Sequence, residues 1–111
     1  MATWEDVRAI AGALPEAEES TSYGRPAFRV RKKTFAWLSP HEDDALVVRV
    51  DADESAALLE ARRDLFFTTP HYERSAMLLI RLADVDADAL REPIEDSWLL
   101  AAPPKLAATL D

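Results

Sequence analysis

The sequence predicts an α+β fold in which an antiparallel β-sheet of about five strands is covered on one face by helices. Three observations support this prediction. Apolar residues with helical spacing occur near both ends of the chain, apolar and polar residues alternate between them, and the early strands are joined by short, hairpin-type connections. The chain has 111 residues and is 49% hydrophobic, which suits a single domain over residues 1–111 with one core.

The first expected element is a helix over residues 3–14. Thr3 is a suitable N-cap, and Asp6 follows three residues later, at the spacing of a capping box. Helical periodicity puts five apolar residues on one face: Trp4, Val7, Ile10, Ala11 and Leu14. Pro15 discourages continuation, because a residue before proline disfavours the α conformation.

A β-hairpin is expected over residues 25–38. A two-residue turn at Lys32-Lys33 is predicted to pair Phe28 with Trp37. This register gives a core face of Phe28, Val30, Phe35 and Trp37 and an opposite face of Arg29, Arg31, Thr34 and Ala36. Because tight hairpin turns favour Gly, Asn or Asp, the two lysines predict a looser loop.

Three further strands follow the hairpin. They are expected over residues 46–50, over residues 65–68 as a short extended piece, and over residues 77–82 as an apolar strand near the centre of the sheet. The polar residues 40–44 form the turn before the first of them.

Two more helices are predicted. A short one over residues 53–62 is capped by Asp51 or Asp53. The last main helix begins at Asp86 or Asp88 and runs to about Leu100. Its buried stripe is Leu90, Ile94, Trp98 and Ala101. Pro93 predicts a kink or a restart in this helix, and a final turn is expected over residues 105–110.

The charges are unevenly distributed along the chain. The formal net charge is −8, yet residues 20–41 contain no Asp or Glu and carry +5, which leaves −13 on the rest. The five cations of this stretch are Arg25, Arg29, Arg31, Lys32 and Lys33. The acidic total opposes non-specific binding to nucleic acid or anionic membranes, so a basic hairpin is a local exception. These cations either pair with carboxylates elsewhere in the fold or form an anion-binding hairpin.

Composition excludes several classes of protein and site. The chain has no cysteine, which excludes disulfides, thiolate metal sites and cysteine nucleophiles. No apolar run reaches the ~18–20 residues that span a bilayer, and the first residues lack a signal-peptide pattern. A cytoplasmic protein without a membrane partner is therefore expected. With only two glycines the chain has no glycine-rich phosphate loop, and no cofactor is expected.

Histidine and carboxylate clusters give little support to catalysis or metal binding. His71 has the chemistry of a general acid or base, but no nucleophile or orienting carboxylate is identifiable beside it. His41 with the acidic residues 42–44 lacks the spacing of a closed metal site. Asp84, Asp86 and Asp88 lack the Gly and Glu of a calcium loop. We therefore expect no catalytic residue, no metal site and no enzyme, although a pocket lined by Arg25, His71 and Tyr72 remains a third hypothesis.

Several segments together resemble the MmcQ/YjbR family along nearly the whole chain. They are residues 23–31 (YGRPAFRVR), 33–36 (KTFA), 66–72 (FFTTPHY), 95–98 (EDSW) and 102–106 (APPKL), with Leu14-Pro15 before the acidic residues 16–19. The resemblance implies a small α+β domain with an antiparallel sheet, similar in outline to frataxin-like folds. Relatives often have Gly at the hairpin turn, where this chain has Lys32 or Lys33.

Members of this family are commonly named DNA-binding proteins, and a "double wing" pair of hairpins is their proposed nucleic-acid element. Carried over, the resemblance implies a first wing of Arg29, Arg31, Lys32 and Lys33, with Arg25 at its start, and a second wing around Thr69, His71, Tyr72 and Arg74. An exposed Tyr72 is expected to stack on a base. DNA is the implied partner, and the chain is expected to be a monomer or a weak homodimer.

An alternative function uses the same cationic hairpin without nucleic acid. In it the chain is a module that binds a protein or a small anion. The acidic residues 84–96 of another copy are one partner that fits by charge.

Overall fold

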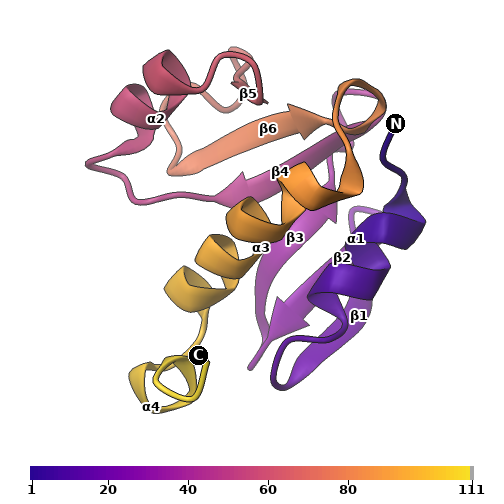
Figure 1. Cartoon of the computed structure of the whole chain (residues 1–111), viewed down its shortest axis with the longest axis vertical. Helices are drawn as coiled ribbons and strands as arrows, with labels where there is room; N and C mark the ends of the chain where they lie inside the picture. The colour runs from indigo at the N-terminus through magenta and orange to yellow at the C-terminus, as the bar shows by residue number, and fades with distance from the viewer. Residues whose placement is uncertain (111) are drawn as a thin grey trace.

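Six antiparallel strands form one sheet in the order β1-β2-β3-β4-β6-β5 in the computed structural model, which describes residues 1–110. The strands are β1 (Ala17–Ser22), β2 (Arg25–Val30), β3 (Lys33–Leu38), β4 (Ala45–Arg49), β5 (Phe66–Phe67) and β6 (Met77–Arg81). The predicted α+β class with an antiparallel sheet is confirmed, with one strand more than expected. Each of the first three connections in the order joins strands that follow one another in the chain, so the sheet begins as a meander (Figure 1).

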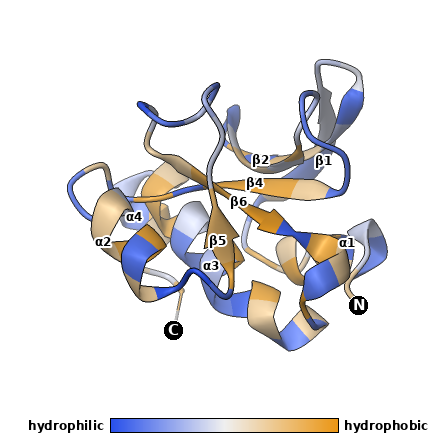
Figure 2. Ribbon diagram, turned by 90° about the horizontal axis from the view of Figure 1, so that it is seen from above, coloured by the Kyte–Doolittle hydropathy of each residue, from blue (hydrophilic) through white to orange (hydrophobic). Residues whose placement is uncertain are grey.

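Among residues 1–110, four α-helices accompany the sheet. They are α1 (Trp4–Ala11), α2 (Ser55–Ala61), α3 (Ala87–Ala101) and α4 (Pro104–Ala107), with a 3₁₀ turn at Leu82–Asp84. Figure 2 shows helices on one side of the sheet and loops rising from the other. Within residues 1–110, no helix has both the length and the apolar composition needed to cross a membrane.

The ends of two helices follow the sequence signals. The Thr3 N–H donates to the Asp6 carboxylate at 2.9 Å, as the capping-box spacing predicts. The predicted stripe Leu90, Ile94, Trp98 and Ala101 on α3 is buried. Pro93 lies inside α3, which continues through it, so the restart expected there does not occur.

The sequence reading missed β1. This strand has the sequence AEESTS, with no apolar side chain larger than Ala, so it lacks the alternation that identifies a half-buried strand. It lies at the edge of the sheet and pairs only with β2, Ala17 opposite Val30 and Ser22 opposite Arg25. Charged residues are common on edge strands because they discourage pairing with other chains.

The predicted hairpin between β2 and β3 exists, but its register is shifted. Val30 pairs with Lys33, so the turn residues are Arg31-Lys32 and not Lys32-Lys33. The expected loose loop is also wrong. Arg31 and Lys32 both have positive φ, of 49° and 73°, which is the backbone of a tight type I′ turn. Side chains are strained in this region, where glycine is not.

The shift is corrected in the core by a β-bulge at Phe35. Arg29 pairs with Thr34, whereas Phe28 pairs with Ala36, so Phe35 is an extra residue in β3. Phe35 and Ala36 consequently both pack in the core on the helix side of the sheet. Trp37 faces the other way and packs with Ala27. The prediction that Trp37 shares a face with Phe28 is therefore wrong, as is the placement of Ala36 on the cationic face.

A buried serine of α3 completes the hydrogen bonding at this bulge. Pairing of β3 with β4 ends at Ala36 opposite Val48. Beyond it, the Ser97 hydroxyl donates to the Phe35 carbonyl at 2.5 Å and accepts from the Arg49 N–H at 2.8 Å. Ser97 is fully buried, so it joins two strands at a place where water cannot.

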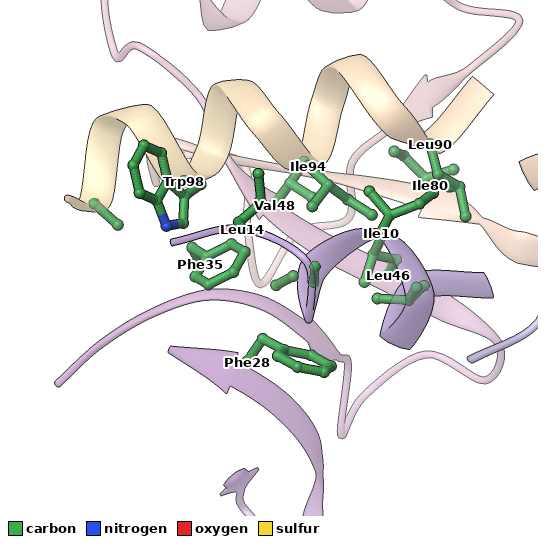
Figure 3. Packing of buried hydrophobic residues seen from close by; sticks show 14 of the residues in the cluster. Ile10, Leu14, Phe28, Phe35, Leu46, Val48, Ile80, Leu90, Ile94 and Trp98 are labelled. Atoms are coloured by element: carbon green, nitrogen blue, oxygen red, sulfur yellow. The ribbon is translucent and has the colours of Figure 1, made fainter. Parts of the chain in front are cut away.

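The main core lies between the sheet and α1 and α3. Figure 3 shows the α3 side chains Leu90, Ile94 and Trp98 packed over residues of the strands and α1. The Trp98 indole N–H also donates to the Pro15 carbonyl at 3.0 Å, which ties α3 to the connection before β1. The orientation of α3 across the sheet is thus fixed by apolar packing and by two polar contacts, from Ser97 and Trp98.

Replacing Ser97 by Ala is expected to lower the free energy of unfolding by about 2–3 kcal/mol, because the Phe35 carbonyl and the Arg49 N–H lose their buried partner. Urea denaturation measures this change. The matched variant Ser55→Ala, at an exposed site where the hydroxyl makes only a local 3.3 Å contact, is expected to change little. Equal losses in the two variants would contradict the role of Ser97.

Replacing Lys32 by Gly is expected to raise the free energy of unfolding by about 0.5–1 kcal/mol, since glycine accepts the positive φ of the turn without strain. Lys33→Gly removes the same charge one residue later, inside β3, and is expected to destabilise by a similar amount. Denaturation of both variants checks the register, because a turn at Lys32-Lys33 would not distinguish them.

Candidate functional site

The face of the sheet opposite the helices, called here the open face, combines arginines with a small apolar cluster. Strand alternation and the pairing registers assign it Glu18, Ser20 and Ser22 of β1 together with Arg25, Ala27, Arg29, Thr34, Trp37, Ala45, Val47, Arg49, Met77, Leu79 and Arg81. Its apolar members pack together with Tyr72 in a second, smaller core. The open face is therefore structured, and its arginines surround a hydrophobic centre.

Arg29 and Arg49 approach Thr34 from the two strands that flank β3. Arg29 pairs with Thr34 in the β2–β3 ladder, and the Arg49 Nε donates to the Thr34 carbonyl at 2.6 Å. The Arg49 guanidinium also lies 5.8 Å from the centre of the Trp37 ring. Burial lowers the pKa of Arg49, since no carboxylate compensates for its lost hydration. The Arg29 Nε is buried and has no hydrogen-bond partner among the described residues.

Two more arginines of the open face lie further along the strands. Arg25 begins β2, directly after a two-residue turn at Tyr23-Gly24. Tyr23 occupies this turn with positive φ and is 87% exposed, the largest exposure of any aromatic side chain in the described chain. On β6, Arg81 donates to the Asp43 carbonyl at 2.9 Å and lies over the Phe67 ring.

The tip of the β2–β3 hairpin has one paired and two unpaired cations. Arg31 forms a two-point ion pair with Glu16, in which its Nη2 lies 2.8 Å from the Glu16 carboxylate. This pairing lowers the pKa of Glu16 and raises that of Arg31. Within residues 1–110, Lys32 and Lys33 form no ion pair, and the same holds for Arg25 and Arg29. Four of the five cations of residues 20–41 thus form no ion pair among the described residues.

The loop over residues 68–76 crosses the open face and is fastened to the β3–β4 turn. Tyr72 is only 5% exposed, and its hydroxyl lies 3.2 Å from that of the buried Ser39. The exposed rings of His41 and His71 lie against each other with centroids 4.0 Å apart and planes tilted by 45°. These contacts hold the loop against the sheet, so Tyr72 supports the second core and does not present a ring to a base.

The predicted site residues are therefore brought together only in part. Arg25, Arg29 and the buried Tyr72 belong to the open face. Lys32 lies in the turn at the hairpin tip, and Lys33 pairs with Val30 and so lies on the helix side of the sheet. His71 and Arg74 are exposed on the crossing loop. Sequence reasoning missed Arg49, Arg81 and the exposed Tyr23. The sequence does contain the information that locates Arg49. Leu46, Val48 and Val50 form one apolar face of a strand, so alternation predicts that Arg49 between them lies on the opposite face.

Comparisons with known proteins agree on one family. The family model described as YjbR matches residues 12–100. The chain is 33% identical over 123 aligned residues to the uncharacterized protein Rv2570 of Mycobacterium tuberculosis and to the uncharacterized protein Mb2600 of Mycobacterium bovis, covering 96% of this chain and 93% of each relative. Among solved structures it is similar to the Deinococcus radiodurans protein DR2400, a DUF419 domain. That similarity has a TM-score of 0.74 and 22% identity, and covers 95% of this chain and 82% of the other.

The ion pair at the hairpin tip predicts a specific acid dependence. The pKa of Glu16 lies below its usual 4.5 because Arg31 binds the carboxylate. A lowered carboxyl pKa stabilises the fold above the unfolded-state value, and this contribution is lost as pH falls below about 4.5 through the folded-state value. An NMR titration of the Glu16 carboxyl is expected to show a midpoint below 4.5 in the parent protein and one near 4.5 in Arg31→Ala. Lys33→Ala is the control, and an equal shift in both variants would contradict the pairing.

Proposed function

Because the chain belongs to the YjbR family, we propose that it binds DNA through phosphate contacts from the open face and the hairpin tip. The observation that carries this proposal is the set of cations without carboxylate partners: Arg25, Arg29, Lys32 and Lys33. Of the other cations, Arg8, Arg62 and Arg63 pair with carboxylates, whereas Arg91 and Lys105 also form no ion pair within residues 1–110. The clustering of four unpaired cations on one hairpin is therefore what supports the proposal. Carboxylates outnumber cations in this chain. A cluster of cations that forms no ion pair therefore supports an anionic partner at that place.

The geometry favours phosphate over base recognition. Guanidinium groups bind phosphate oxygens through two parallel hydrogen bonds. Arg29 and Arg49 lie on adjacent sides of one strand, next to the flexible lysines of the tip. A phosphodiester chain that follows the hairpin meets Lys32 and Lys33 first and these arginines next. Such contacts position a duplex without specifying its sequence.

Tyr23 is the aromatic residue best placed to contact a base. It stands at the β1–β2 turn beside Arg25, with its ring in solvent. Stacking of a base on such a ring adds affinity with little sequence preference. Tyr72, to which the family resemblance assigned this role, is buried in the second core.

A salt titration tests the proposal. Fluorescence anisotropy of a labelled duplex of mixed sequence, from about 50 to 200 mM salt, is expected to give a log–log slope of about −4 for four to five phosphate contacts. The double variant Arg29→Ala/Lys33→Ala is expected to reduce this slope by about 2, because each phosphate contact contributes about one unit. Glu16→Gln is expected to strengthen binding, since it releases Arg31.

The matched control is Arg91→Ala. Arg91 is an exposed arginine on α3, away from the open face, and no ion pair involves it among residues 1–110. It is expected to leave both the affinity and the slope nearly unchanged. Absence of binding at about 50 mM salt, or equal losses in Arg91→Ala and the double variant, would overturn the proposal.

One observation favours a second candidate, a small-anion site at Arg29 and Arg49. The Arg29 Nε is buried without a partner among the described residues, and an oxyanion bound beside it would supply one. Inorganic phosphate, titrated at constant ionic strength, separates the two functions. Saturable binding that is lost in Arg29→Ala, together with no binding of the duplex, supports the small-anion site.

A further inference from the structure

The helix side of the protein contains a groove that plays no part in the proposed function. It has a volume of about 740 Å³ and lies between α2 and α3, over the ends of β4 and β5. Its floor is apolar, because Val48, Val50, Leu65 and Phe66 belong to the main core. In Figure 1, α2 stands apart from α3 on this side of the sheet.

The groove remains partly uncovered at one end. Leu99 and Leu100 line it and are 41% and 44% exposed, which is unusual for large apolar residues in this chain. The opposite wall is α2, a seven-residue helix without a buried side chain. Adjacent exposed leucines beside an apolar floor indicate a surface that a partner covers.

A row of carboxylates runs along the groove on α3. Asp88, Glu92 and Asp96 follow at intervals of four residues and all line it, and Asp51 and Glu54 stand near its other wall. None of the three α3 carboxylates is in an ion pair within the described part of the chain. Burial, with the charges of Glu92 and Glu95, raises the pKa of Asp96. A cation in the groove would relieve this repulsion.

The cations that line the groove neutralise this row only in part. Arg62 forms its ion pair with Asp64, although the charge of Glu92 also raises the pKa of Arg62. The Arg49 guanidinium turns to the open face, where it binds the Thr34 carbonyl. The occupant that fits by charge is therefore basic, and the floor requires that it also be apolar.

The spacing of the carboxylates indicates the backbone conformation of this occupant. Four residues of an α-helix advance about 6 Å, so the carboxylate row repeats every 6 Å or so and the groove from Asp88 to Leu100 is about 18 Å long. In an extended chain, alternate side chains lie on the same side and repeat about every 6.6 Å. Five or six extended residues therefore span the groove with basic side chains toward the carboxylates and apolar ones toward the floor.

We propose that this groove binds an extended peptide segment of a partner protein in which basic and apolar residues alternate. Three Lys or Arg side chains at every second position face Asp88, Glu92 and Asp96, and the intervening apolar side chains contact the floor and Leu100. The groove and the open face lie on opposite sides of the sheet, so this binding is independent of the DNA-binding proposal.

The test uses the pentapeptide Arg-Leu-Arg-Leu-Arg, acetylated and amidated, with the full chain. NMR titration is expected to shift the amide or methyl signals of Leu58, Leu99 and Leu100 saturably. The block isomer Arg-Arg-Arg-Leu-Leu is expected to bind several-fold more weakly, because its cations cannot match the row. A peptide with Glu in place of Arg is expected not to bind.

Matched variants locate the site. The double variant Glu92→Gln/Asp96→Asn is expected to lower the affinity for the alternating peptide by about tenfold, because two charge contacts are lost. Removal of these neighbouring charges relieves repulsion, so the variant is expected to fold. The control Glu18→Gln/Glu73→Gln removes the same charge outside the groove lining and is expected to change affinity by less than about twofold.

Three results would overturn the proposal. The first is equal affinity for the two isomeric peptides or for spermidine, which would show that only charge is recognised. The second is an equal effect of the two double variants. The third is a set of shifted signals confined to residues outside the groove. A failure of DNA binding has no bearing on these outcomes.

Discussion

The arrangement of this protein depends on the contact between Ser97 and the bulge at Phe35. The extra residue in β3 lets Phe35 and Ala36 both enter the main core, but it ends the β3–β4 ladder early. The Ser97 hydroxyl occupies the break and binds both strands. The same break leaves the Thr34 carbonyl to the Arg49 side chain. One irregularity therefore fixes α3 against the sheet on one side and places a guanidinium beside Arg29 on the other.

The two signs of charge concentrate on different parts of the molecule. Arg25, Arg29, Arg49 and Arg81 lie on the open face, with Glu18 opposite Arg29 in the register, whereas Asp88, Glu92 and Asp96 line the groove on the helix side. The molecule is 26 Å across its shortest axis, and the Debye length at physiological salt is about 8 Å. The acidic side consequently repels a polyanion at the open face only weakly. A net charge of −8 is therefore compatible with local phosphate binding, and it opposes the coating of DNA by many copies.

The sequence predicted the elements with strong periodicity and missed those fixed by tertiary contacts. The predictions of the buried stripe on α3 and of the apolar strand at β6 were correct, because burial imposes a regular apolar pattern on these segments. The register of the β2–β3 hairpin was wrong because it depends on a bulge, and the hydroxyl that completes the bulge comes from Ser97, more than sixty residues away. At the candidate site, the basic stretch was visible in the sequence. The pairing of Arg31 with Glu16 was not, because β1 had no apolar pattern that would bring Glu16 to the hairpin.

The buried Tyr72 also limits what the open face recognises. The loop that carries it covers the hydrophobic centre of this face, held by Ser39 and by the contact between the His41 and His71 rings. A ligand is left with the arginines around the covered centre and with the tip of the hairpin. These groups offer hydrogen-bond donors for phosphate, whereas base edges are read mainly by side chains that enter a groove. A DNA-binding function of this surface therefore depends on the shape and charge of the DNA backbone. Within residues 1–110, Tyr23 at the β1–β2 turn is the one aromatic side chain exposed enough to add a stacking contact.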